Sequence, residues 1–379
     1  MKNTIIAIVV VVIIAAIAWY GWGNKGTENT LAEGEPVKVG VISPMTGDAA
    51  IYGEANANVL KLAAEEINAA GGIDGHQIEL LIEDGKCTGA SAVSAAQKLI
   101  NIDKVEVIIG GFCSGESLAI VPVAEAAKVA LLSDGSSSPD LTNVSKFFAR
   151  DYPSDNTQGV VLAQAVLAKE IKNISFIQEQ TDYALGIYKA FSEEFEKNGG
   201  VITKEEYPSE ANDFRSQLGK LKAANPDTLF ISAQTPASAQ RILKQMREMN
   251  WQPQLLLSDV IADPQTLTEY KDMVEGAYGA QFGENRENPK FQGLVANYEA
   301  KYGTDLPYPS YAQTEYDALY LVADAIREVG YDGEKIAKWL REVEDWQGAS
   351  GSVTMGSDGD RDGGHILKIV KNGEFVNAE

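Results

Sequence analysis

The stretch VKVGVISPMTGDAAIYGEANANVLKLAAEEINAAGGIDGHQIELLIEDGKC, residues 37–87, decides the fold of this chain. It begins at 37–43 with an apolar, β-branched segment, which predicts a buried strand. Apolar residues then recur at helical spacing over 55–70, and a glycine pair at 71–72 ends the predicted helix. A second apolar strand follows at 78–84. Strand, helix and strand in this order are typical of a parallel β-α-β unit.

The same alternation continues along most of the chain. Further strands are predicted at 105–112, 128–133, 174–179, 201–206, 228–233, 254–258, 277–282, 352–355, 365–371 and 374–376. Further helices are predicted at 90–102, 116–127, 156–170, 184–198, 213–224, 236–249, 288–302, 311–329 and 333–344. Such alternation predicts parallel sheets with helices on both faces. Because a second series begins near Ser154, we expect an α/β protein with two sheets.

Length and charge narrow the class of protein further. A chain of 379 residues is long enough for two domains of ordinary size. It carries 54 acidic and 32 basic residues, so its net charge is -22. A nucleic-acid-binding protein needs clustered Lys and Arg, and this balance argues against that class. We interpret the acidity as a self-repelling, soluble surface.

The N-terminus differs from the rest. Residues 5–22 (IIAIVVVVIIAAIAWYGW) carry no charge and would span about 27 Å as a helix, close to the hydrocarbon thickness of a bilayer. We favour an uncleaved membrane anchor, and a signal peptide cleaved after Ala16-Ile17-Ala18 is the alternative. Residues 23–35 are predicted to be a polar linker. In both cases the rest of the chain lies outside the cytoplasm.

Cys87 and Cys113 are the two cysteines of the chain. An oxidising compartment allows them to pair, and two buried free thiols are the alternative. Each follows a predicted strand, so neighbouring parallel strands would bring them together.

The segment GFCSG at 111–115 lies between a predicted strand and a predicted helix, as a catalytic nucleophile elbow does. A cysteine-dependent amidohydrolase using Cys113 is therefore one hypothesis. It would need a His base, and the chain has His76 and His365 alone, both far from Cys113 in sequence. The alternative is that Ser114 and the backbone N–H groups of the helix start bind an anion.

No metal or cofactor is predicted. Residues 358–363 (DGDRDG) resemble the start of a calcium loop, but Ile369 stands at position twelve, where that loop needs a bidentate Glu. We therefore predict a solvated hairpin turn at 358–363. Two Cys and two His offer no paired zinc spacing, and no phosphate-binding glycine loop is present.

Polar and aromatic residues follow several of the predicted strands. In open parallel sheets ligands bind beyond the carboxyl ends of the strands, so these residues are placed to line a cleft. Singly, each has a structural explanation as a cap, a turn or a packing residue. The set comprises Tyr52 after the first strand, the hydroxyl-rich segment 133–139 after the fourth, and Tyr183, Gln234 and Asp259 in the second series.

Four segments resemble the type 1 periplasmic binding proteins of branched-chain amino acid (leucine/isoleucine/valine) ABC transporters. They are VGVISPMTGDAAIYGEA, INAAGGIDGHQIELLIEDGKC, VIIGGFCSGES and GSVTMGSDGDRDG, within a likeness that runs from Val37 to Val376. The resemblance implies two Rossmann-like lobes joined by three crossover strands. We assign residues 36–152 and 280–347 to lobe 1, and 153–279 and 348–379 to lobe 2.

The resemblance also implies roles for single residues. Ser114 and Ser137 would bind a ligand carboxylate, while the carbonyl of Gly135 and the carboxylate of Asp259 would accept from its ammonium group. Tyr52 and Tyr183 would flank the ligand side chain, and Cys87 and Cys113 would form a disulfide. Asp134 and Gln234 depart from the pattern of the family toward polarity, which argues against a purely aliphatic ligand.

The sequence thus predicts a monomeric, extracytoplasmic solute-binding protein rather than an enzyme. It would capture an amino acid or similar small zwitterion by lobe closure and deliver it to a permease and ATPase in the same membrane. A ligand-binding sensor for amides, urea or aromatic acids is the alternative function.

Overall fold

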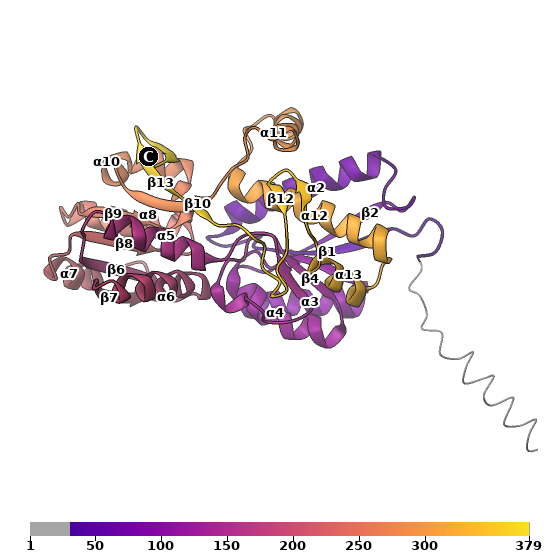
Figure 1. Ribbon diagram of the computed structural model, residues 1–379, viewed down its shortest axis with the longest axis horizontal. Coiled ribbons are helices and arrows are strands. Elements are labelled where there is room, and N and C mark those ends of the chain that lie inside the picture. Colours follow the sequence, from indigo (N-terminus) through magenta and orange to yellow (C-terminus); the bar gives the residue numbers. More distant parts are fainter. Residues whose placement is uncertain (1–30, 379) are drawn as a thin grey trace, which may run out of the picture.

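The computed structural model describes residues 31–378 and contains two sheets, each covered by helices (Figure 1). The two sheets lie in two lobes side by side along the long axis of the molecule. The predicted anchor at residues 5–22 lies outside the described residues. Within 31–378, no helix is both long and apolar enough to cross a bilayer.

The first lobe is built on a five-stranded parallel sheet in the order β2-β1-β3-β4-β5. Its strands are β1 (Val37–Ser43), β2 (Ile78–Asp84), β3 (Val107–Gly110), β4 (Ala130–Ser133) and β5 (Phe148–Arg150). Its helices are α2 (Ala50–Ala69), α3 (Gly89–Lys98), η1 (Leu99–Asp103), α4 (Ser114–Ala127), η2 (Pro139–Leu141), α11 (Pro289–Tyr302), α12 (Pro309–Val329) and α13 (Gly333–Leu340). The antiparallel pair β11 (Trp346–Gly348) and β12 (Gly351–Val353) completes it.

The second lobe is built on a seven-stranded sheet in the order β14-β13-β10-β9-β8-β6-β7, in which β13 and β14 run antiparallel to their neighbours. Its strands are β6 (Asn173–Glu179), β7 (Val201–Tyr207), β8 (Thr228–Ser232), β9 (Gln254–Leu257), β10 (Tyr278–Phe282), β13 (His365–Lys371) and β14 (Glu374–Asn377). Its helices are α5 (Asp155–Leu167), α6 (Asp182–Lys197), α7 (Arg215–Ala223), α8 (Pro236–Glu248), η3 (Asp259–Ala262), α9 (Pro264–Glu269) and α10 (Lys271–Val274).

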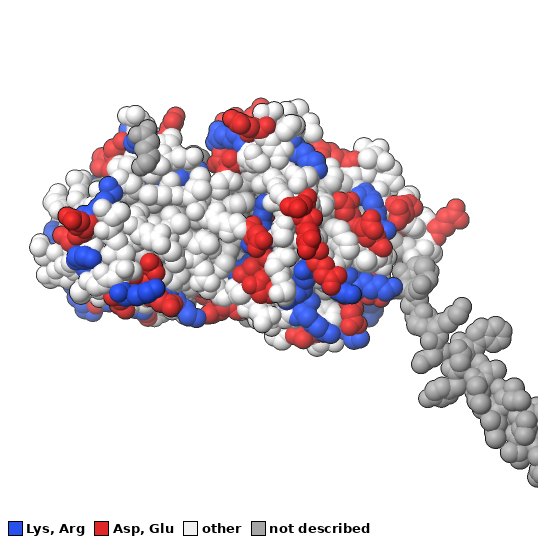
Figure 2. Space-filling model, in the orientation of Figure 1, with Lys and Arg blue, Asp and Glu red and all other residues white. Residues whose placement is uncertain are grey.

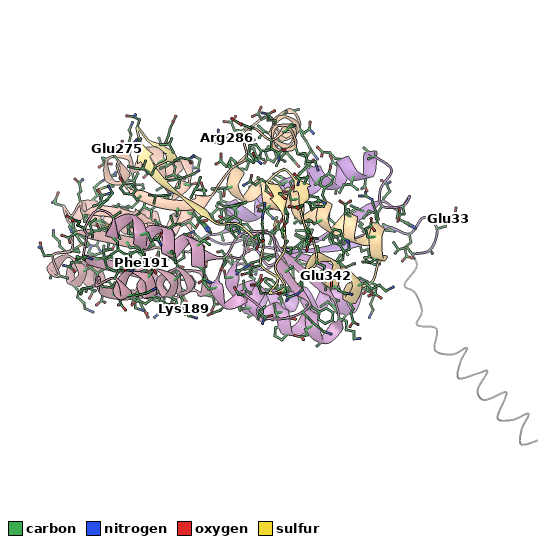
Figure 3. All side chains as sticks on the ribbon, in the orientation of Figure 1. Glu33, Lys189, Phe191, Glu275, Arg286 and Glu342 are labelled. Atoms are coloured by element: carbon green, nitrogen blue, oxygen red, sulfur yellow. A yellow bond between two sulfur atoms is a disulfide. The ribbon has the colours of Figure 1, made fainter. Side chains whose placement is uncertain are left out.

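Each sheet has an apolar core on both faces, which is why its central strands are apolar throughout. In the first lobe, Val39 packs with Leu319 of α12 on one face, while Ile108 packs with Ile120 of α4 on the other. In the second lobe, Phe191, labelled in Figure 3, lies in the core between the sheet and helices α5 and α6. The alternating pattern of the sequence therefore predicted the layers correctly.

The positions at which the chain passes between the lobes differ from the predicted domain limits. Strand β10, which ends at Phe282, belongs to the second sheet, although we assigned 280–282 to the first lobe. Val353 and Met355 pack in the core of the first lobe, although we assigned 348–379 to the second. The last passage therefore comes after Met355, because the short β11–β12 hairpin uses its apolar side chains to cover the first sheet.

The segment 358–363 is not the solvated hairpin turn that we predicted. It lies on the last passage between the lobes, where Asp360 accepts from Arg150 Nε at 2.8 Å and from Arg150 Nη2 at 2.9 Å. The Arg150 side chain is fully buried. A buried guanidinium requires a paired carboxylate, so the acid-rich loop supplies the counterion that fixes this passage. Within residues 31–378, no group of three or more His, Cys, Asp or Glu side chains could hold a metal ion.

Two smaller differences concern local structure. Helix α2 begins at Ala50 rather than at residue 55, so Tyr52 lies in its first turn. Strand β5 has only three residues, too few for a periodic signal, and was not predicted. On the face in view in Figure 2, acidic side chains lie beside basic ones, in keeping with a charged surface.

Candidate ligand-binding site

A narrow cleft lies between the two lobes, and residues of both lobes line it. The residues that line it are Tyr52, Phe112, Cys113, Ser114, Gly135, Ser137, Tyr183, Gln234, Val260 and Tyr311. Six of the seven predicted ligand-binding residues thus lie together, and the seventh, Asp259, is next to Val260.

Ser114 is the first residue of helix α4, directly after the disulfide-bonded Cys113. Its Oγ accepts a hydrogen bond from the backbone N–H of Ser138 at 3.1 Å, which leaves the hydroxyl proton free to donate. The helix start also contributes the positive end of its dipole. This wall of the cleft therefore suits a carboxylate or another anion.

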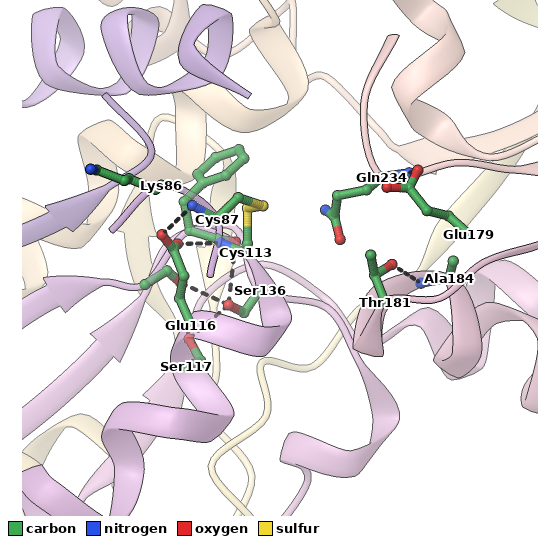
Figure 4. Close-up of a disulfide and its surroundings, with 12 residues drawn as sticks. Lys86, Cys87, Cys113, Glu116, Ser117, Ser136, Glu179, Thr181, Ala184 and Gln234 are labelled. Atoms are coloured by element: carbon green, nitrogen blue, oxygen red, sulfur yellow. Dashed lines mark hydrogen bonds between the residues drawn. A yellow bond between two sulfur atoms is a disulfide. The ribbon is translucent and has the colours of Figure 1, made fainter. Parts of the chain in front are cut away.

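Cys87 and Cys113 form a disulfide, with Cα atoms 5.3 Å apart. The disulfide that the resemblance implied is thus confirmed, and the hypothesis of a catalytic Cys113 thiol is wrong because that sulfur is bonded. Figure 4 shows how the disulfide sits beside Ser136 and Glu116. It joins the loop after β2 to the start of α4, next to Ser114.

Glu116 supports this wall of the cleft, a role that was not predicted from the sequence. Its Oε1 accepts from the backbone N–H of Cys87 at 2.8 Å, and its Oε2 accepts from that of Cys113 at 2.9 Å (Figure 4). Burial raises the pKa of the carboxyl to about 7, although both hydrogen bonds favour the ionised form. The sequence does carry a signal for it, because an acid three residues after the helix N-cap, here Glu116 after Cys113, is typical of a capping box.

Most of the hydroxyl-rich segment 133–139 is structural. Ser133 and Ser136 donate to the carbonyl of Gly111 at 3.0 and 2.7 Å, and Ser117 donates to the same oxygen at 2.9 Å. Ser137 is the hydroxyl that reaches the cleft, and it donates to Asp155 Oδ2 at 2.6 Å. Of the predicted wall of hydroxyl donors, Ser114 and Ser137 line the cleft, and Ser114 keeps its proton for a ligand.

Asp259 is 2% exposed and accepts three tyrosine hydroxyls. Tyr183 donates to Oδ1, while Tyr152 and Tyr311 donate to Oδ2 at 2.9 and 2.6 Å. Burial and the Asp259 charge raise the pKa of all three phenols, so they stay protonated as donors. The sequence did not predict Tyr152 and Tyr311 as part of this site, because neither follows one of the predicted strands of the second lobe. Tyr183 and Tyr311 line the cleft, so their hydroxyl oxygens lie between the Asp259 carboxylate and a ligand.

A second polar group lies behind Ser137. Its partner Asp155 has Oδ1 3.7 Å from Nε2 of His365, and both side chains are fully buried. The Thr157 hydroxyl donates to the Ser154 carbonyl, so it accepts from His365 Nδ1 at 2.7 Å, and Nδ1 carries the ring proton. Burial lowers the pKa of His365 to about 4 and raises that of Asp155. The His365 ring is therefore neutral at neutral pH.

The remaining walls are formed by close packing. A Cβ at Gly135 would lie 2.6 Å from the Phe112 ring, so glycine is needed there for the ring to line the cleft. On the other side, the backbone N–H of Gln234 donates to Glu179 Oε2 at 2.9 Å, which positions the residue at the start of the turn after β8. Figure 4 shows the Gln234 side chain extending toward the disulfide.

Asp134 does not line the cleft, contrary to the prediction that it makes the pocket more polar. It is buried, and its Oδ2 accepts from Asn56 Nδ2 at 2.6 Å. Burial raises its pKa to about 6. The side chain is held by a hydrogen bond from helix α2 and is not among the residues that line the cleft, which the order of residues along the chain does not reveal.

Comparisons with known proteins agree with this geometry. A family model described as periplasmic binding protein matches residues 36–371. Leu/Ile/Val-binding protein homolog 7 of Brucella abortus is 27% identical over 329 residues, which cover 81% of each chain. A solved leucine-binding protein from Thermotoga maritima is 30% identical, with a TM-score of 0.83, and the match covers 90% of this chain and 98% of that one.

A second solved structure is the branched-chain amino acid transporter substrate-binding protein of Streptococcus pneumoniae in complex with isoleucine. It is 27% identical, with a TM-score of 0.80, and the match covers 91% of this chain and 100% of that one. The family model covers most of the chain, and the fold and the cleft between the lobes agree with it. This chain belongs to the periplasmic binding protein family, as a type 1 solute-binding protein of the ABC transporter kind, an extracytoplasmic binder of small molecules and not an enzyme.

Proposed function

We propose that this protein captures an amino acid zwitterion in the cleft between its lobes and delivers it to an ABC permease and its ATPase. The observation that carries the proposal is the polarity of the cleft. Ser114 at the helix start lies on one wall, while the tyrosine-capped Asp259 lies behind the other.

A zwitterion must lose water to enter such a cleft, so each of its charges needs a replacement partner. The Ser114 hydroxyl and the N-terminus of α4 receive the carboxylate, with Ser137 beside them. The ammonium group is received by the Gly135 carbonyl and by Asp259, whose charge acts through the oxygens of Tyr183 and Tyr311. Tyr52 and Tyr183 flank the ligand side chain.

Lobe closure follows from this arrangement. Ser114 and Ser137 belong to the first lobe, whereas Tyr183 and Asp259 belong to the second, so both sets of contacts form only when the lobes are together. The ligand then shifts the population toward the closed form. We propose that residues 5–22 keep the protein at the membrane, where the closed form docks on the permease.

The test is a thermal-shift screen of the full chain, solubilised in mild detergent, against amino acids, amides, urea and aromatic acids. A ligand at 100 times its Kd raises the unfolding free energy by about 2.7 kcal/mol. We expect at least one L-amino acid to raise the melting temperature. A response to aromatic acids or amides alone would favour the sensor or a different cargo, and no response to any zwitterion would overturn the proposed ligand class.

A further inference from the structure

The cleft is more polar than a site for an aliphatic side chain requires. Among the described residues that line it, Val260 is the one aliphatic side chain. Hydroxyl or amide groups come from Tyr52, Ser114, Ser137, Tyr183, Gln234 and Tyr311. The carboxylate and ammonium groups of an amino acid ligand cannot pair with all six of these polar side chains.

Four of the six are engaged with protein partners. Ser137 donates to Asp155, and Tyr183 and Tyr311 donate to Asp259. Ser114 accepts from Ser138 and keeps one proton for the ligand carboxylate.

Two polar groups of the cleft make no such contact. The Tyr52 side chain is 4% exposed, and its hydroxyl has no hydrogen-bond partner within residues 31–378. Gln234 uses its backbone N–H, while its side-chain amide bonds to none of the described residues. The two come from different lobes, Tyr52 from helix α2 and Gln234 from the turn after β8.

A buried polar group without a partner is costly, so the ligand that binds best supplies a partner for the buried Tyr52 hydroxyl. The half-buried Gln234 amide, on the opposite wall of the cleft, is available to the same ligand. An aliphatic side chain supplies none. A phenol and a carboxamide each donate and accept, so they match a neutral group that does the same. Hydroxyl and carboxamide groups have this property.

Charged side chains fit less well. A second carboxylate would face the Asp259 charge, and no Lys or Arg is among the described residues that line the cleft. A second ammonium group would find no free carboxylate, because three tyrosine hydroxyls already occupy Asp259.

We infer that the ligand is a neutral amino acid with a hydroxyl or carboxamide side chain, such as serine, threonine, asparagine or glutamine, and that Tyr52 and Gln234 select it. This inference rests on the proposed function and narrows it. Tyr52 and Gln234 are specificity-determining residues rather than the residues that hold the charged ends.

The experiment is calorimetric titration of the full chain, in detergent, with these four amino acids and with leucine, isoleucine and valine. We expect at least one of the four to bind at least about tenfold more tightly than any of the three, since one unsatisfied buried group weakens binding roughly five- to hundredfold. If leucine, isoleucine or valine binds most tightly, the inference is overturned while the proposed function stands. If no amino acid of either group binds, the proposed function fails as well.

Three variants assign the effect to residues. Tyr52→Phe and Gln234→Leu each remove one polar group at nearly constant volume, and each should lower the preference for the polar ligand over leucine at least about fivefold. Gln292→Leu makes the same exchange on the exposed face of α11 and should leave the preference unchanged. An unchanged preference in both Tyr52→Phe and Gln234→Leu, with the fold intact by circular dichroism, would overturn the assignment to these residues.

Discussion

The hydroxyl of Tyr311, on the first lobe, donates to the carboxylate of Asp259, on the second lobe, across 2.6 Å. Since Tyr152 and Tyr183 donate to the same carboxylate, this acid joins the two lobes and sets the charge at one end of the cleft. Closure and ligand affinity are therefore expected to depend on the same side chain.

Replacing Asp259 by Asn removes the negative charge and gives one of the tyrosine donors an amide N–H instead of an oxygen. We expect amino-acid affinity to fall at least about tenfold, because charge-assisted hydrogen bonds contribute roughly 1.5–3 kcal/mol. Calorimetry measures the change. Asp227→Asn, at an exposed position of the same lobe, is the matched control. An unchanged affinity in the Asp259 variant would refute the ammonium site.

Replacing Tyr311 by Phe removes one of the tyrosine hydrogen bonds that join the lobes and keeps the ring. We expect the ligand Kd to rise more than about fivefold. Asp48→Asn breaks the exposed ion pair with Arg241, which also joins the two lobes, at 2.9 Å. This substitution should change the Kd less than about fivefold, because exposed ion pairs are weak. Equal effects of the two substitutions in titration would show that Tyr311 has no special part in closure.

Replacing Gly135 by Ala places a methyl group 2.6 Å from the Phe112 ring. The ring must move toward the ligand, so we expect a loss of affinity of about tenfold and of stability by roughly 1–3 kcal/mol. Chemical denaturation and titration measure both. Gly219→Ala, which meets no atom within 4 Å on helix α7, should instead be neutral or stabilising. A Gly135 variant with unaltered affinity would contradict the tight packing of this wall.

Replacing both Cys87 and Cys113 by Ser removes the cross-link between the loop after β2 and helix α4. We expect the free energy of unfolding to fall by about 2–4 kcal/mol, because the unfolded chain regains freedom. Reduction of the wild-type protein should have a similar effect in denaturant titrations. If neither treatment shifts the denaturation midpoint, the disulfide does not contribute to the stability of this wall.

The pH dependence of stability follows from the buried carboxyls. Burial raises the pKa of Glu116 to about 7 and that of Asp134 to about 6, above their ordinary values. Between the ordinary and the raised pKa the folded state binds more protons than the unfolded state, so stability falls as the pH rises through this range. His365, with a pKa lowered to about 4, acts in the opposite direction below pH 6.5.

Because the buried carboxyls with raised pKa outnumber His365, we expect the melting temperature to be higher near pH 5.5 than near pH 8. Asp134→Asn removes one of these carboxyl groups and should make the melting temperature depend less on pH between pH 4 and 6. A melting temperature that rises steadily from pH 5.5 to pH 8 would contradict this balance of charges.

The sequence predicted the sheets and most helices because their signals are local. The apolar strands at 37–43 and 228–233 are separated from helices by glycine and polar turns, so their own residues are enough to predict them. The predicted cleft residues lie together for a related reason, since the carboxyl ends of parallel strands meet at one edge of a sheet. What the sequence could not give was the partner of each side chain.

Chain order thus placed Ser114, Tyr183 and Gln234 at the cleft, and the resemblance to the family added Ser137. The tertiary structure alone decided that Ser133 and Ser136 hold the Gly111 carbonyl, that Asp134 turns to Asn56, and that Tyr152 and Tyr311 cap Asp259. Local periodicity indicates which face of an element is buried. The hydrogen bonds named above join residues 22 to 107 positions apart, so they depend on how elements pack within a lobe and on how the two lobes meet. The sequence by itself therefore determined the helices and strands, whereas the packing inside the first lobe and the meeting of the two lobes decided which side chains bond to one another.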